Sequence, residues 1–119
     1  MSWLPSSWFG GSDPVAPLMR EFLQACRDEG LPVKITSTRR SEEEQARLYA
    51  QGRTEPGPVV TWTLNSKHVS GEAFDCTIVG APEYDDAPEA WDLLGELGED
   101  LGLDWGGSFG DFGHFELPD

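Results

Sequence analysis

The sequence contains little that would tie the protein to an oxidising compartment or to a membrane. Its two cysteines, Cys26 and Cys76, form no disulfide framework, so we expect free thiols. No apolar run approaches the ~20 residues of a membrane-spanning helix, and no charged-then-apolar leader opens the chain. We therefore expect no membrane insertion, and synthesis in the cytoplasm without a signal peptide.

Lys and Arg are absent from positions 68–119. All 8 Lys and Arg lie between Arg20 and Lys67, where they are balanced by acidic residues, so the net charge of −14 belongs to positions 68–119. The electric field of this negative charge repels the phosphate backbone of a nucleic acid. Nucleic acid is therefore not an expected partner.

The spacing of apolar and turn residues predicts helices at residues 14–29, 42–51 and 88–101 and strands at 33–38, 73–79 and 114–117. Ser41 and Glu44 form a capping box at the start of the second helix. Gly95 and Gly98 weaken the prediction of the third. Few strands and segregated helices favour an α+β fold, a small antiparallel sheet flanked by helices, within one domain of residues 1–119 whose core spans about 14–117.

An aspartate interrupts the second predicted strand. Side chains alternate along a strand, so Ala73, Asp75 and Thr77 face one way while Cys76 faces the other. A carboxylate in such a strand is costly to bury unless hydrogen-bond donors or a charge compensate it. A divalent metal is one strong compensator, and Ala73 leaves space beside Asp75.

The only two histidines could converge on this aspartate. Gly71 allows the chain to turn back between His68 and Asp75, and His114 lies in the glycine-rich segment WGGSFGDFGHFEL. These three side chains would give a metal three N/O ligands and leave a fourth position open for water, which is the pattern of a catalytic zinc site. Asp111 is then the candidate to take a proton from that water.

Two alternatives remain open at this point. Glu116 lies on the same strand face as His114 and could be a ligand, a base or an outer partner of a ligand, although we rank it behind Asp111 as the base. Arg39 and Arg40 follow the first strand, where an arginine could stabilise an oxyanion or bind a carboxylate. An ion pair with the acidic residues 42–44 is the simpler interpretation for one of them.

Three ordered blocks of residues carry a family resemblance. The first is Arg40, Ser41, Gln45, Leu48, Tyr49, Gly52, Arg53 and Thr54; the second is Ser66, His68, Gly71, Ala73 and Asp75; the third is Trp105, Gly106, Gly107, Asp111 and His114. Together they resemble the zinc D-Ala-D-Ala peptidase family, and within it the L-alanyl-D-glutamate endopeptidases of bacteriophages and bacilli.

The resemblance implies a fold of the lysostaphin, D-Ala-D-Ala peptidase and hedgehog type, without a separate cell-wall-binding domain. It also implies a zinc-dependent phage endolysin that cuts the peptidoglycan stem peptide between L-Ala and D-Glu. The implied roles are zinc binding by His68, Asp75 and His114, proton transfer by Asp111, oxyanion stabilisation by Arg40 and substrate positioning by Ser66. Arg39, Arg53 and Lys67 add positive charge for the acidic stem peptide.

Two rival functions follow from the same residues. One is a D,D-carboxypeptidase or dipeptidase acting on D-Ala-D-Ala, and the other is a non-catalytic zinc-binding module, as in hedgehog proteins. The presence of Asp111 and Arg40 argues against the second rival. We expect a monomer that stays in the host cytoplasm before lysis and then acts on the cell wall.

Overall fold

Four short strands form one antiparallel sheet in the order β1-β2-β4-β3. The computed structural model describes residues 13–61 and 66–119, so part of the long loop before Ser66 lies outside the described residues. The strands are β1 (Val33–Ser37), β2 (Ala73–Ile78), β3 (Asp104–Trp105) and β4 (His114–Glu116). The helices are α1 (Ala16–Asp28), α2 (Glu42–Ala50) and α3 (Pro88–Asp100), with 3-10 turns η2 (Tyr84–Asp86) and η3 (Gly106–Phe109). The predicted α+β architecture is confirmed.

The first residue of a helix was predicted correctly from the local sequence for α2 but not for α1. Ser41 caps α2 as predicted, because its Oγ accepts a hydrogen bond from the backbone N–H of Glu44 at 3.0 Å. Helix α1 begins at Ala16 rather than at Pro14. The side chain of Asp13 does not cap this helix, since its carboxylate binds Arg39 instead.

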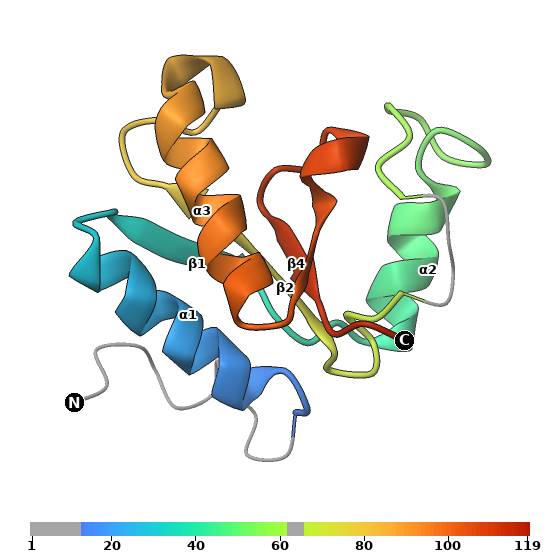
Figure 1. Ribbon diagram of the computed structural model, residues 1–119. Helices are drawn as coiled ribbons and strands as arrows, with labels where there is room; N and C mark the ends of the chain where they lie inside the picture. Colours follow the sequence, from blue (N-terminus) through green and yellow to red (C-terminus); the bar gives the residue numbers. More distant parts are fainter. Residues whose placement is uncertain (1–12, 62–65) are drawn as a thin grey trace.

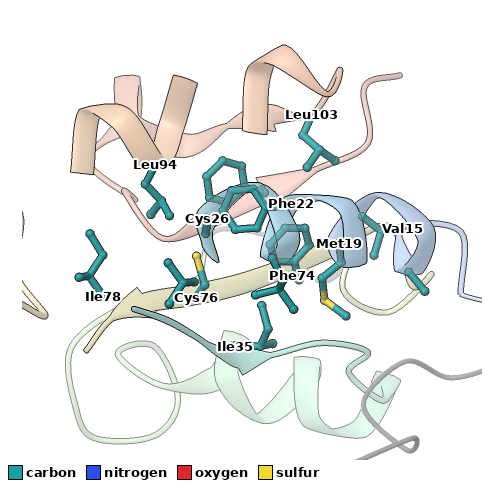
Figure 2. Close-up of a cluster of buried hydrophobic side chains, with 14 of the residues drawn as sticks. Val15, Met19, Phe22, Cys26, Ile35, Phe74, Cys76, Ile78, Leu94 and Leu103 are labelled. Carbon is teal, nitrogen blue, oxygen red and sulfur yellow. The ribbon is translucent and has the colours of Figure 1, made fainter. Parts of the chain in front are cut away.

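One face of the sheet is covered by α1 and α3, which lie side by side in Figure 1 and contact each other. Figure 2 shows side chains from both helices and from the strands meeting in this core. Its centre is aromatic, because the ring of Phe22 packs against Phe74 and Phe115 with centroids 5.4 and 4.7 Å apart. Burial of these rings fixes which face of β2 and β4 points inward.

The opposite face of the sheet is polar and carries Asp75, Thr77, His114 and Glu116, since these side chains alternate with the buried ones. Asp75 and His114 are direct cross-strand partners in the pairing of β2 with β4. Helix α2 stands apart from α1 and α3 on the other side of β4 (Figure 1). The core thus leaves one face of the sheet for polar side chains.

The two cysteines belong to the core. Both are free thiols and buried, which confirms the expectation of no disulfide. Burial raises the pKa of Cys26 to about 12 and also raises the pKa of Cys76 well above its ordinary value. Both thiols therefore stay protonated at neutral pH. Within residues 13–61 and 66–119, no helix is both long and apolar enough to cross a bilayer.

The glycines that weaken the sequence pattern of α3 have a packing role. A Cβ atom at Gly98 would overlap the ring of Phe115, and one at Gly95 would overlap the indole of Trp105. Both rings belong to the β3–β4 pair that packs under α3. The absence of side chains at these two helical positions lets the helix approach the strand that carries His114.

Replacement of Gly98 by alanine tests this close approach. We expect Gly98→Ala to lower the free energy of unfolding by about 1–3 kcal/mol through overpacking, although alanine gains about 1 kcal/mol of helix propensity over glycine. Denaturant unfolding followed by circular dichroism measures the change. Glu99→Ala, at an exposed position of the same helix, is the control and should change stability little. A Gly98→Ala protein as stable as the parent would contradict the packing role.

Candidate metal centre

His68, Asp75 and His114 come together at the polar face of the sheet. One donor atom from each side chain lies within 4.8 Å of the other two. Asp75 is in the middle of β2, His114 is the first residue of β4, and His68 lies in the turn before β2. The predicted convergence of three residues from separate segments is therefore present in the fold.

The turn before β2 holds His68 in one orientation. Gly71 adopts a positive φ of 74°, which lets the chain reverse toward β2 as the sequence suggested. The backbone carbonyl of His68 accepts a hydrogen bond from the N–H of Arg40 at 2.9 Å, and its ring Nδ1 lies 2.8 Å from the carbonyl oxygen of Thr38. Because a carbonyl can only accept, Nδ1 carries the proton. The other ring nitrogen, Nε2, faces Oδ2 of Asp75 at 3.2 Å.

His114 lies between two carboxylates. Its Nδ1 is 2.9 Å from Oδ1 of Asp75, and its Nε2 is 2.8 Å from Oε1 of Glu116. Burial disfavours the imidazolium, but the hydrogen bonds to Asp75 and Glu116 outweigh burial and raise the pKa of His114 to about 9. Burial also opposes ionisation of Asp75, yet the hydrogen bonds from both histidines hold the pKa of its carboxyl well below the usual range.

The three donors fit a divalent cation. Two imidazole nitrogens and one ionised carboxylate form the mixed N/O set that binds zinc in catalytic sites. Thr38 leaves the Nε2 atom of His68 available, and Asp75 remains charged because its pKa is depressed. His68 is 3% exposed, so a bound cation would be shielded from solvent on that side. The residues present therefore match a metal site.

Asp111 lies beside the three donors without being one of them. Its loop is fixed by two backbone hydrogen bonds, from Asp111 N–H to the Gly106 carbonyl and from His114 N–H to the Asp111 carbonyl. Burial raises the pKa of Asp111, and the negative charge of Asp75 raises it further. A carboxylate with raised proton affinity next to a metal site suits proton transfer.

Glycine allows this loop to lie directly against the sheet. A Cβ atom at Gly113 would collide with the backbone carbonyl oxygen of Cys76. The same two residues are joined by a hydrogen bond of 2.9 Å from the Cys76 N–H to the Gly113 carbonyl. A Cβ atom at Gly106 would likewise collide with the backbone carbonyl oxygen of Asp111. The glycines of WGGSFGDFGHFEL therefore permit the close backbone approach that the sequence suggested.

Two hollows meet at Asp75 and Asp111, which line both of them. The first, of about 380 Å³, is also lined by Arg40, Ser66, Lys67, His68, His114 and Glu116. The second, of about 300 Å³, extends over Thr36, Thr77, Tyr84 and Phe112. The candidate metal centre thus borders both hollows.

Arg40 and Ser66 both reach the first hollow. The guanidinium of Arg40 donates to Oε1 of Gln45 at 2.7 Å, and Gln45 is completely buried on α2. This bond holds Arg40 at the wall of the cleft. Ser66 accepts a hydrogen bond from the backbone N–H of His68 at 3.1 Å, so it also shapes the turn that presents the histidine.

The structure does not bring Arg39 and Arg53 into the cleft. Arg39 forms an ion pair with the buried carboxylate of Asp13 at 2.7 Å and lines a separate small cavity. Arg53 donates to the backbone carbonyls of Tyr49 and Thr61 and lies 3.9 Å over the Tyr49 ring. Their expected substrate contacts have no support in this geometry, because nearer acceptors hold both guanidinium groups.

Some contacts of the site could not be predicted from the sequence. The hydrogen bond from His68 to Thr38 uses a backbone carbonyl, which leaves no signal in residue type. The ion pair between Lys67 and Glu116 spans 49 positions at 3.2 Å. For Glu116 the sequence did carry a signal, because the alternation of side chains in HFEL places Glu116 on the same face of the strand as His114.

Comparison with known proteins shows which peptidases the chain is similar to. Residues 60–117 match the family model described as D-alanyl-D-alanine carboxypeptidase. The peptidoglycan L-alanyl-D-glutamate endopeptidase CwlK of Bacillus subtilis (strain 168) is 35% identical over 108 residues, covering 78% of this chain and 65% of the relative. The chain is thus similar to peptidases of the D-alanyl-D-alanine carboxypeptidase type, and it spans 65% of the length of this curated relative.

Solved structures share the fold. The Serratia marcescens L-Ala D-Glu endopeptidase ChiX matches with a TM-score of 0.63 at 24% identity, covering 86% of this chain and 78% of that one. The vancomycin resistance D,D-pentapeptidase VanY, in complex with Zn(II), matches with a TM-score of 0.62 at 17% identity, covering 87% and 70%. The expected peptidase-like α+β fold is confirmed by both matches.

A cation-binding measurement tests the three-donor group. We expect a divalent cation to raise the melting temperature of the chelator-treated protein, because binding to the folded state alone adds about 2.7 kcal/mol at a concentration 100 times Kd. His68→Ala should abolish this increase. Thr77→Ala, on the same face of β2, should keep it. Equal stabilisation of the His68→Ala protein would show that the cation binds elsewhere.

Proposed function

We propose that this chain is a zinc-dependent peptidoglycan peptidase that cuts the stem peptide, between L-Ala and D-Glu. The observation that carries the proposal is the placing of Asp111 and Arg40 in the same cleft as the His68, Asp75 and His114 group. A purely structural metal site has no use for a nearby carboxylate of raised proton affinity. The similarity to CwlK supports the bond specificity.

The three donors would hold zinc with one coordination position left for the reaction. When bound, zinc supplies a Lewis acid that polarises the scissile carbonyl and lowers the pKa of water toward ~7. His68 and Asp75 are oriented by contacts already made in the protein, from Thr38 to the ring of His68 and from both histidines to the carboxylate. The site is thus preorganised by its neighbours.

Asp111 moves the proton in this proposal. One of its carboxylate oxygens accepts a proton from the attacking water and then delivers it to the nitrogen of the leaving amine. Burial and the charge of Asp75 raise the pKa of Asp111, which favours its protonated form between the two transfers. The loop bond between the Asp111 carbonyl and His114 N–H keeps the base next to the centre.

Arg40 stabilises the oxyanion that forms when water adds to the carbonyl carbon. Its guanidinium, a planar group with several N–H donors, lies at the wall of the first hollow. The bond to buried Gln45 removes much of the orientational freedom of the arginine before substrate arrives. Stabilisation of the developing charge therefore needs little reorganisation.

The shape of the cleft favours cleavage within a peptide. Hollows of about 380 and 300 Å³ are both lined by Asp75 and Asp111, which leaves room beside the proposed site for more than one terminal residue. A carboxypeptidase needs only a short pocket for the terminal residue on one side. The D,D-carboxypeptidase alternative takes its support from the family model, and Arg40 could bind a terminal carboxylate there.

Assignment to a phage endolysin, held in the host cytoplasm until lysis, remains part of the proposal. It rests on the resemblance of the three motifs to phage endopeptidases. The acidic second half of the chain is unusual for a protein that acts on an anionic wall. This charge is a reason to measure activity over a range of salt concentrations.

Replacement of Asp111 by asparagine tests the proposed base. We expect Asp111→Asn to keep the metal and to lose about 10²–10⁴-fold in the rate of muropeptide cleavage, the usual contribution of a general base. Cleavage is followed by liquid chromatography of purified muropeptides, and zinc by elemental analysis. Asp104→Asn, an exposed acid on β3, is the matched control. Undiminished cleavage by Asp111→Asn would overturn the assignment.

Mass spectrometry of the products separates the two peptidase functions. Cleavage between L-Ala and D-Glu leaves alanine on the glycan and releases the rest of the stem as one peptide with a new amino terminus at D-Glu. A D,D-carboxypeptidase releases only free D-Ala from pentapeptide stems. We expect the first pattern, and release of D-Ala alone would contradict the proposed bond specificity.

A further inference from the structure

Glu116 and Lys67 form an ion pair at the edge of the metal centre, and the proposed mechanism uses neither. Oε2 of Glu116 lies 3.2 Å from Nζ of Lys67, and the other oxygen, Oε1, lies 2.8 Å from Nε2 of His114. The side chains of Glu116 and Lys67 are only 31% and 22% exposed. Partial burial reduces the screening that weakens ion pairs at open surfaces.

The two nitrogens of His114 face different carboxylates. Nδ1 faces Asp75 within the three-donor group, whereas Nε2 faces Glu116 on the opposite side of the ring. An imidazole that binds a cation through one nitrogen keeps its proton on the other, and that N–H needs an acceptor. Oε1 of Glu116 is at the right distance to be this acceptor.

Glu116 lies outside the three-donor group. The donor atoms that cluster within 4.8 Å come from His68, Asp75 and His114, and Glu116 is not among them. Of the three possibilities that the sequence left open for Glu116, the geometry favours the outer partner. The carboxylate is also fixed from behind, because Nζ of Lys67 donates to the carbonyl of Leu117 in addition to its contact with Glu116.

The two histidines therefore have unlike outer partners. The ring of His68 donates to the neutral carbonyl of Thr38, whereas the ring of His114 donates to a carboxylate. Hydrogen bonds to an ionised acceptor are roughly twice as strong as neutral ones. A charged acceptor also makes the opposite nitrogen a stronger electron donor, so His114 is the histidine whose metal bond depends more on its neighbour.

We propose that Glu116, anchored by Lys67, is a positioning residue that fixes the ring orientation and proton position of His114 for metal binding. The inference rests on the metal site of the proposed function and adds a determinant of its affinity. It also reassigns Lys67, which the sequence suggested for substrate attraction. In the structure the ammonium of Lys67 contacts Glu116, the carbonyl of Leu117 and the exposed carboxylate of Asp119.

Zinc affinity, measured by competition with a chromophoric chelator, tests this role without reference to catalysis. We expect Glu116→Ala to bind zinc about 10–100-fold more weakly than the parent, the usual effect of removing an outer partner. Glu116→Gln should be affected less, because its amide oxygen can still accept from Nε2 but carries no charge. The zinc affinity of Lys67→Met should lie between the affinities of Glu116→Gln and the parent. The visible spectrum of the cobalt-substituted proteins should change in the same order.

The control is Asp104→Asn, which removes a negative charge from the cross-strand partner of Glu116. Its zinc affinity should stay within about two-fold of the parent, since the lost acceptor bond and not the lost charge is expected to matter. Melting curves of the metal-free variants identify any loss of folding, and Glu116→Gln and Lys67→Met keep the test valid if Glu116→Ala is unstable.

Two results overturn the inference in distinguishable ways. If His68→Ala loses zinc while all Glu116 and Lys67 variants bind it as tightly as the parent, the positioning role is wrong and the metal site stands. If the parent protein itself binds no zinc, the proposed metal site fails together with the inference. Graded loss across the three variants supports both.

Discussion

The cross-strand pair of Asp75 and His114 is the contact on which the site depends. The two residues are register partners in β2 and β4, and their side chains meet at 2.9 Å on the polar face. A slip of either strand by one residue would turn its member of this pair into the core. The register is held from the other face, where the neighbouring pair Phe74 and Phe115 stacks with centroids 5.5 Å apart.

Close packing around the sheet also determines the positions of helix α3 and of the loop that carries Asp111. The glycines of α3 let that helix lie against Phe115 and Trp105, and Gly113 lets the loop of Asp111 rest on the backbone of β2. The base is therefore placed by backbone contacts and not by its own side chain. The same apolar burial that stabilises the fold also sets the spacing between the proposed base and the donors.

The sequence predicted much of the fold and of the donor group, for reasons that are local. The Ser41 cap of α2, the alternation in β2 and the turn at Gly71 depend on near neighbours, and each is present in the structure. Strand β3 was not predicted, because two residues carry no periodicity and its formation depends on pairing with β4. The ion pair of Arg39 with Asp13, 26 residues away, could not be identified from spacing.

The central claim is that two imidazoles and one carboxylate of this chain hold zinc. X-ray absorption spectroscopy of the zinc-loaded protein tests it directly, since it reports the atoms bound to the metal. The account predicts one zinc per chain with nitrogen and oxygen neighbours at about 2.0–2.2 Å, including imidazole scattering, and no sulfur. A sulfur shell near 2.3 Å, which would require the buried thiols of Cys26 or Cys76, would contradict it.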